Sequence, residues 1–301
     1  MDEPTWLLRG ASYHFVSGQA LWFGLALLLL AVRAEEWEWK SGTVLLFALL
    51  GLTWIALSGW PSFWLQGLLF VAACSWLIRP ALPMQSAVPS SAWLGQAVIA
   101  VAAIAVLLET SWLLGPWKKP GPIAELAVIG DSVTAGLNDG DAIWPRVLAE
   151  SGSCSVWDAS QQGATVESAS RQLARLQGRG DALLIEIGGN DLLEGLPLRK
   201  FAERLETLLK SARPQYRTIV MLELPLPPLS NRYGVIQRRL ARRYGVPLIP
   251  KREFARVLTM SGATVDGIHL SDRGQQRMAD VVRAWLRLQG TAAEYHRVNV
   301  R

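Results

Sequence analysis

The feature that most restricts how this chain can fold is an uncharged stretch of 38 residues, from Ser41 to Ile78. A single helix of that length would reach roughly 57 Å, almost twice the thickness of the hydrocarbon core of a bilayer. The segment Ser58-Gly59-Trp60-Pro61, near the middle of the stretch, contains residues that commonly interrupt a helix. The stretch therefore predicts two membrane spans, over about residues 43–59 and 62–78.

Two further apolar segments, over about residues 15–32 and 92–114, extend this pattern to the whole N-terminal part of the chain. Residues 1–117 contain only ten charged side chains but eleven of the fourteen tryptophans. Four buried helices of a soluble bundle are the alternative, but no segment carries the polar face that such helices turn toward water. We therefore expect a transmembrane domain of about four helices over residues 1–117, in an integral protein of the bacterial inner membrane.

Four spans place both ends of the chain on one side of the membrane, and the flanking charges leave open which side that is. The basic residues are divided equally, with Arg9, Lys118 and Lys119 on one side and Arg33, Lys40 and Arg79 on the other. Glu109 lies within the fourth span, where an unpaired carboxylate is costly. It either lines a polar pocket or pairs with a neighbouring helix, or it reaches the interface or is protonated.

The remainder of the chain, residues 118–301, carries 26 basic and 19 acidic side chains, a net charge of +7. Such a charge suits nucleic acid or anionic lipid, but no pattern of aromatic and basic recognition residues accompanies it. We therefore expect a solvated basic surface beside an anionic bilayer, and no nucleic-acid partner. Cys74 and Cys154 are far apart in the sequence and are not expected to form a disulfide.

After a short linker at residues 118–122, strand-like and helix-like patterns alternate over residues 123–290. The expected strands lie at 124–129, 154–157, 182–187, 218–223 and 246–249, and amphipathic helices are expected at 197–212, 232–245 and 271–288. This alternation predicts an α/β domain in which a five-stranded parallel sheet is covered by helices on both faces. Residues 291–301 are expected to form a poorly ordered tail.

The ends of the first three expected strands carry polar or glycine-rich segments. Ser132 directly follows the first strand, residues 160–163 follow the second, and residues 188–191 follow the third. Because right-handed crossovers bring the carboxyl ends of parallel strands to one edge, these segments should meet there. That edge is where open α/β sheets bind their ligands.

A serine at this edge becomes a nucleophile only when a base lies within hydrogen-bond reach. Of the three histidines, His269 is the best candidate, because His14 lies at the membrane edge and His296 in the tail. Asp266 precedes His269 by three residues and can accept from its Nδ1, which leaves Nε2 free to take the serine proton. The same order of Ser, Asp and His occurs in α/β-hydrolases, although their Gly-x-Ser-x-Gly elbow is not met.

An attacked carbonyl also needs hydrogen-bond donors that point at the developing oxyanion. Three are available at the same edge: the backbone N–H of Ser132, the backbone N–H of Gly163 and the side-chain amide of Asn190. Each motif alone is typical of an ordinary turn, and only their combination indicates catalysis. A phosphate loop is excluded because no Gly-Lys-Ser/Thr follows the glycine-rich segment.

Four segments carry a resemblance to a known family: GDSVTAG (130–136), SQQGATVES (160–168), IEIGGNDLLEGLP (185–197) and VDGIHLSDRGQ (265–275). They resemble the four sequence blocks of the SGNH (GDSL) hydrolase superfamily, within its arylesterase/thioesterase I/lysophospholipase branch. The segments AIWPRVLAESG and ELPLPP also look like that branch. The resemblance covers about residues 123–290 and does not extend to the membrane part.

The resemblance implies that Ser132 is the nucleophile, Asp266 and His269 its acid and base, and Gly163 and Asn190 the remaining oxyanion-hole donors. It further implies a three-layer α/β/α, flavodoxin-like fold, with neither a metal nor a cofactor. The chain departs from the family pattern at Val133, and at Asp158 and Ser160, where relatives often have Asn and Gly. The change at Val133 touches no catalytic atom, whereas those at Asp158 and Ser160 bear on loop shape and substrate fit.

The sequence therefore predicts a membrane-anchored serine ester hydrolase that works through an acyl-enzyme. Its substrate would be an acyl ester near the bilayer, such as a lysophospholipid or another lipid, a thioester or an O-acylated glycan. An acyltransferase that passes the acyl group to a sugar or lipid hydroxyl is an open alternative, as is a membrane scaffold without catalysis. The acyl chain length, the leaving group, the oligomeric state and any protein partners also stay open.

Overall fold

The computed structural model describes residues 4–60, 62–79, 91–114, 120, 122–138, 140–288 and 293–298. The chain divides into two compact units. We call Met1–Tyr13, Leu114–Pro225 and Tyr233–Arg301 the sheet unit, and His14–Leu113 with Leu226–Arg232 the helical unit. Most of the expected linker, including Lys118 and Lys119, lies outside the described residues.

A helix occupies each of the four segments that we expected to span the membrane. They are α2 (Ala20–Glu36), α3 (Ser41–Leu57), α4 (Phe63–Ile78) and α5 (Ser91–Leu113), and α1 (Pro4–Val16) precedes them. Within the first segment, expected from about residue 15, the helix is interrupted between Val16 and Ala20, where α1 and α2 are bent by 84°. Gly18 at this break has a φ of 86°, a conformation that glycine adopts without steric cost.

Helices α2 and α3 pack closely through two glycines that face each other. A Cβ atom added to Gly24 would lie 2.8 Å from the Gly51 carbonyl oxygen, and one added to Gly51 would lie 2.8 Å from that of Gly24. Such close backbone approach through small residues is common where helices associate in membranes. Glu109 on α5 is buried, with 4% of its surface exposed.

Length and composition single out α5 among the described helices. Its segment Ser91–Trp112 has 22 residues and a mean hydropathy of 2.1, so it is long and apolar enough to cross a membrane. The bent pair α1 and α2 passes the same test if it is taken as one span, whereas α3 and α4 have only 17 and 16 residues. Because a span needs about 20 residues, four spans stay a proposal rather than a finding.

A short segment from late in the sequence, Leu226–Arg232, belongs to the helical unit. The Leu226 carbonyl oxygen lies so near Gly59 that an added Cβ would be 2.9 Å away. Asn231 donates from Nδ2 to Gln66 Oε1 on α4 at 3.4 Å, and the Arg232 guanidinium lies 6.0 Å from the centre of the Phe63 ring. Residues on both sides of this segment belong to the sheet unit.

The sheet unit is built on a parallel sheet whose first five strands match the expected ones within about two residues at each end. They are β1 (Glu125–Gly130), β2 (Ser155–Asp158), β3 (Ala182–Glu186), β4 (Thr218–Leu222) and β5 (Leu248–Ile249). The strand order is β5-β4-β3-β1-β2-β6, and every pairing is parallel. Strands β2-β1-β3-β4-β5 follow the order of flavodoxin-like folds.

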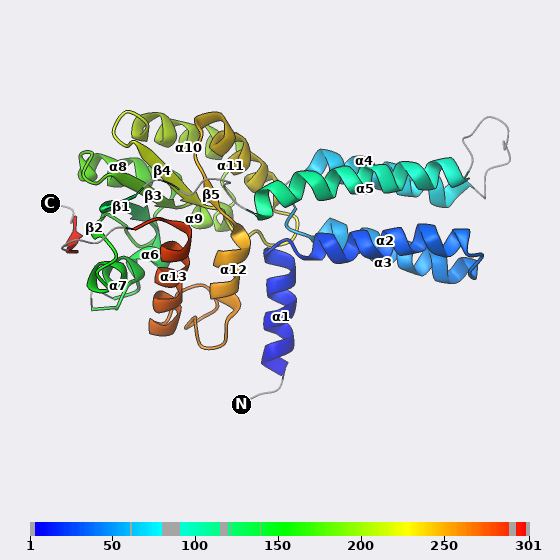
Figure 1. Ribbon diagram of the computed structural model, residues 1–301, viewed down its shortest axis with the longest axis horizontal. Coiled ribbons are helices and arrows are strands. Elements are labelled where there is room, and N and C mark those ends of the chain that lie inside the picture. The colour runs from blue at the N-terminus through cyan, green and yellow to red at the C-terminus, as the bar shows by residue number, and fades with distance from the viewer. Residues whose placement is uncertain are drawn as a thin grey trace. The chain divides into compact units, whose positions relative to one another are not determined.

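Helices cover both faces of this sheet, as Figure 1 shows. On one face lie α8 (Val166–Leu176), α10 (Leu198–Ala212) and α11 (Asn231–Tyr244), and on the other lie α7 (Trp144–Glu150), α12 (Lys251–Thr259) and α13 (Asp272–Trp285). The short helices α6 (Ser132–Ala135) and α9 (Gly189–Leu193) follow β1 and β3. Trp144, Phe254 and Met278 join strand residues such as Val128 and Leu184 in one buried core. The predicted α/β class with a parallel sheet is confirmed.

The expectation of a five-stranded sheet is wrong, and so is that of a poorly ordered tail over residues 293–298, while residues 291–292 and 299–301 of the expected tail lie outside the described residues. A sixth strand, β6 (Tyr295–Arg297), pairs in parallel with β2 and extends the sheet. The strand has only three residues, too few for a periodic pattern, and side chains rather than length hold it in place. Tyr295 and Arg297 both bind the buried carboxylate of Asp158 on β2.

Candidate active site

Ser132 is the first residue of α6, immediately beyond the carboxyl end of β1. The Asp131 carboxylate caps this short helix by accepting the Val133 N–H at 2.9 Å. The turn is so tight that a Cβ on Gly130 would lie 2.5 Å from Thr134 Oγ1, so a larger residue would displace the helix. The sequence thus builds a sharp strand-to-helix turn that holds Ser132 with 9% of its surface exposed.

Asn190 follows β3, the neighbour of β1 on the side away from β2. The chain runs from β1 to β2 on one side and then crosses to β3 on the other, so the strand order reverses between β1 and β3. Ligands of open α/β sheets bind at such a reversal, beyond the carboxyl ends of the strands. Ser132 and Asn190 therefore lie where the topology predicts a binding site.

The Asn190 amide connects two of the segments that sequence analysis brought together. Its Nδ2 donates to the Ala164 carbonyl at 2.9 Å and, in a longer bond of 3.4 Å, to Asp131 Oδ2. Gly163 precedes Ala164 and has a φ of 66°, and no other group lies within 4 Å of the position of its missing Cβ. The glycine therefore leaves an open approach to its backbone.

Asp266 and His269 lie in the loop between α12 and α13, and their side chains are in direct contact. His269 Nδ1 lies 2.6 Å from Asp266 Oδ2, and Asp266 Oδ1 accepts the backbone N–H groups of His269 and Ile268 at 2.8 and 3.0 Å. These three hydrogen bonds, that of the imidazole first, lower the pKa of Asp266. The carboxylate is thus held in its charged form and fixes the orientation of the imidazole.

One side chain connects helix α13, which follows the His269 loop, with the Ser132 turn. Gln275, in the first turns of α13, accepts the Trp144 N–H at 2.8 Å and donates to the Val133 carbonyl at 3.5 Å. Within the turn, burial raises the pKa of the Asp131 carboxyl, and the hydrogen bond from the Val133 N–H opposes that effect.

A buried pair of carboxyl groups lies directly beneath the Ser132 turn. Glu186, at the end of β3, accepts Thr134 Oγ1–H at 2.9 Å and the Asp131 N–H at 3.2 Å. Burial first, and the neighbouring Asp131 carboxylate second, raise the pKa of Glu186 well above its ordinary value of 4.5. Because two neighbouring buried carboxyl groups resist ionising together, the pair favours a form in which Glu186 keeps its proton.

The variant Glu186→Gln should make the stability of the protein less dependent on pH. Above its ordinary pKa of 4.5 Glu186 ionises in the unfolded chain but keeps its proton in the folded one. The free energy of unfolding therefore falls as the pH rises through that window. Glutamine imitates the protonated acid and does not titrate, so the Tm of the variant minus that of the wild type should increase from about pH 5 to about pH 8. Parallel Tm curves for the two proteins would contradict a protonated Glu186.

Sequence reasoning missed Glu186 and also Gln172, which is buried and bonds both the N–H and the carbonyl of Gly130 at 2.9 Å. The signal for Glu186 was available, because a single acidic residue interrupts the otherwise apolar strand ALLIEI. Gln172 carries no such signal, because a glutamine on an amphipathic helix is ordinary.

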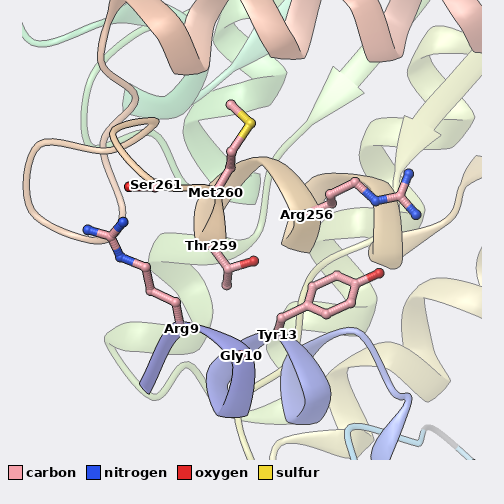
Figure 2. Close-up of a pocket in the computed structure, with 7 residues that line it drawn as sticks. All are labelled: Arg9, Gly10, Tyr13, Arg256, Thr259, Met260 and Ser261. Carbon is pink, nitrogen blue, oxygen red and sulfur yellow. The ribbon is translucent and has the colours of Figure 1, made fainter. Parts of the chain in front are cut away.

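A pocket of about 440 Å³ lies elsewhere in the sheet unit and includes none of the predicted site residues. Figure 2 shows its lining, which consists of Arg9, Gly10, Tyr13, Arg256, Thr259, Met260 and Ser261. Among the described residues, no group of three or more His, Cys, Asp or Glu side chains could hold a metal ion. Cys74 and Cys154 are both free thiols, as predicted.

A parallel α/β/α sheet that presents a serine at its strand-order reversal has the architecture of one large class of hydrolases. Comparisons with known proteins agree with this class. The family described as "GDSL-like Lipase/Acylhydrolase family" matches residues 128–277, so the chain carries a GDSL/SGNH hydrolase domain of the esterase type.

Individual relatives cover the same part of the chain. Thioesterase 1/protease 1/lysophospholipase L1 of Escherichia coli K12 is 28% identical over 165 residues, which are 52% of this chain and 79% of the relative. Arylesterase of Vibrio mimicus is 27% identical over 171 residues, 52% of this chain and 86% of the relative. The chain in the crystal structure of TesA is 27% identical in sequence to this chain, with a TM-score of 0.47. The matched region is 53% of this chain and 96% of the TesA chain.

Proposed function

We propose that this protein is a membrane-anchored serine ester hydrolase with Ser132 as nucleophile, His269 as general base and Asp266 as the group that orients the base. The contact between Asp266 and His269, in a loop tied to the Ser132 turn through Gln275, is the observation that carries the proposal. With Nδ1 engaged by the carboxylate, Nε2 is the imidazole nitrogen left to accept a proton.

The reaction would proceed in two steps, acylation of Ser132 and hydrolysis of the acyl-enzyme. Ser132 Oγ attacks the acyl carbonyl while His269 Nε2 takes its proton, and the resulting tetrahedral intermediate expels the alcohol or thiol, which receives that proton. Water then attacks the acyl group on Ser132, giving one proton to His269, and the collapse of the second intermediate returns it to Ser132 Oγ. The products are a free acid and the regenerated enzyme.

The negative charge of both intermediates would be bound by three donors. These are the backbone N–H groups of Ser132 and Gly163 and the side-chain amide of Asn190. The Asn190 amide keeps its 2.9 Å bond to Ala164, and its longer bond to Asp131 is the one that a substrate oxygen would replace. Each donor of this kind contributes roughly 3 kcal/mol to transition-state stabilisation in other serine hydrolases.

The proposal includes a membrane anchor formed by the helical unit. Helix α5 would be its main spanning helix, and α2 to α4 would also be embedded in the membrane. The mean hydropathy of 2.1 in α5 and the exposed Leu45, Leu46 and Leu49 on α3 support this placement. The substrate would then be an acyl ester at or near the bilayer, whether a lipid, a thioester or an O-acylated glycan.

One experiment tests catalysis and anchoring together. Membranes that contain the full chain are washed with alkaline carbonate and then treated with a fluorophosphonate probe, which modifies only activated serines. We expect a labelled protein in the washed membrane pellet. A labelled protein released by the wash would refute the anchor, whereas an unlabelled pellet protein would refute the nucleophile. Formation of a new ester with a supplied sugar or lipid hydroxyl, rather than free acid, would instead indicate an acyltransferase.

A further inference from the structure

The C-terminal strand β6 is fixed to the loop that carries Gly163. Arg297, the last residue of β6, donates from Nη1 to Ser160 Oγ at 3.1 Å and from Nη2 to the Ser160 carbonyl oxygen at 2.9 Å. The same guanidinium forms an ion pair with Asp158, which is completely buried. One side chain thus binds the end of β2 and the first turn of the following loop.

Further hydrogen bonds join β6, Asp158 and Ser160. Tyr295 Oη donates to Asp158 Oδ2 at 3.0 Å, and the backbone N–H of Val298 donates to the Asp158 carbonyl at 2.8 Å. The other carboxylate oxygen, Asp158 Oδ1, accepts the Ser160 N–H at 2.9 Å. Ser160 is therefore held through its N–H, its carbonyl and its hydroxyl at once, an unusually complete fixation for a loop residue.

Gly163 lies between two fixed points of this loop. At one end Arg297 holds Ser160, and at the other end the Asn190 amide holds the Ala164 carbonyl at 2.9 Å. In between, Gln162 Nε2 donates to the Leu137 carbonyl at 2.7 Å, the Gln161 N–H donates to the Gly130 carbonyl at 3.0 Å, and the Ala164 N–H donates to the Gln161 carbonyl at 3.2 Å, closing a turn that contains Gly163. The orientation of the Gly163 N–H is therefore set by a hydrogen-bonded loop that begins at Ser160, the residue that Arg297 holds.

A second pocket brings β6 together with the helix that Ser132 begins. It has a volume of about 380 Å³ and is lined by Tyr295 and Arg297 of β6 together with Ala135, the last residue of α6. None of the candidate site residues lines this pocket, so it connects β6 with α6 and not with the reacting groups.

We propose that Arg297 is a positioning residue of the active site, which holds the oxyanion-hole N–H of Gly163 in place by clamping Ser160 and Asp158. The inference rests on the proposed role of Gly163 as an oxyanion donor. In this arrangement Arg297 acts through Ser160 and Asp158, and its guanidinium itself is not placed among the reacting groups.

The test is the hydrolysis of p-nitrophenyl butyrate by the full chain in detergent, with variants of two adjacent residues on β6. His296→Ala is the matched control, because His296 points to the opposite face of the strand and stacks on Trp157 at 4.1 Å. Removing an oxyanion donor lowers kcat by about 10²- to 10³-fold, so a misplaced one should cost about 10- to 100-fold. We therefore expect Arg297→Ala to lower kcat by about 10- to 100-fold, with KM changed less than about threefold. The kcat of Arg297→Lys should lie between those of Arg297→Ala and the wild type, because lysine keeps the charge but not the two-pronged hydrogen bonding. The kcat of His296→Ala should stay within about twofold of the wild type.

A second variant separates positioning from folding, because Arg297→Ala leaves the Asp158 carboxylate buried and unpaired. In the double variant Asp158→Asn/Arg297→Ala the buried charge is gone, so we expect its Tm to recover while its kcat stays low. The inference would be overturned by a kcat of Arg297→Ala equal to that of His296→Ala, or by full recovery of kcat in the double variant. A wild type that does not hydrolyse the ester at all would instead refute the proposed function, whatever the β6 variants do.

Discussion

Ser132→Ala should abolish ester hydrolysis, with kcat reduced on the order of 10⁶-fold, the loss that follows removal of the nucleophile in other serine hydrolases. The variant has no oxygen with which to form an acyl-enzyme, and the remaining donors can only assist attack by water. The measurement is the initial rate with p-nitrophenyl butyrate together with labelling by a fluorophosphonate.

The matched control for this variant is Ser170→Ala, which removes a hydroxyl from helix α8 and leaves the strand-to-helix turn unchanged in sequence. Both variants should keep the Tm of the wild type, because each loses only one oxygen atom. Retention of more than about one hundredth of the wild-type kcat by Ser132→Ala would exclude Ser132 as the nucleophile.

Asp266→Asn should lower kcat by about 10³- to 10⁴-fold while the fold stays intact. Asp266 accepts the imidazole Nδ1–H at 2.6 Å, and an amide in its place offers an N–H as readily as an oxygen. The imidazole can then carry its proton on Nε2, the nitrogen that must accept the serine proton. The loss should fall on kcat, because Asp266 takes no part in binding the substrate.

The control for Asp266→Asn is Asp272→Asn, which removes the same charge from the first turn of α13, three residues beyond His269. We expect Asp272→Asn to stay within about threefold of the wild type, because electrostatic effects at an exposed position are small. Equal losses in the two variants would show that net charge near His269, and not its orientation by Asp266, determines the rate.

The parts of the fold that sequence reasoning predicted are those in which local pattern and topology agree. Strands β1 to β5 are short apolar runs bounded by turn residues, and helices α10, α11 and α13 repeat apolar residues at helical spacing. The contact between Asp266 and His269 was predictable for the same reason, since residues three apart share one turn. The catalytic roles of Ser132, Gly163 and Asn190 stay predictions.

The parts that were missed depend on contacts between distant residues. Strand β6 has three residues and no periodic pattern, and it is fixed by Arg297 binding Asp158, which lies 139 residues away in the sequence. The bend at Gly18 was missed because Ser17, Gly18 and Gln19 form only a short break in a segment that is apolar on both sides. Glu186 is visible in the sequence as the one acidic residue of an apolar strand, but its contact with Asp131, which is 55 residues earlier, is not.

The placement of Leu226–Arg232 in the helical unit means that the two halves of this protein are not interchangeable modules. If the chain were truncated between Leu113 and Leu114 and its N-terminal part removed, these seven residues would lose their contacts with Gly59, Gln66 and Phe63. A fusion of the hydrolase domain to a different membrane segment would therefore also require changes in the loop after β4. Because residues of the hydrolase sequence pack in the helical unit, we expect the two parts to be inherited together.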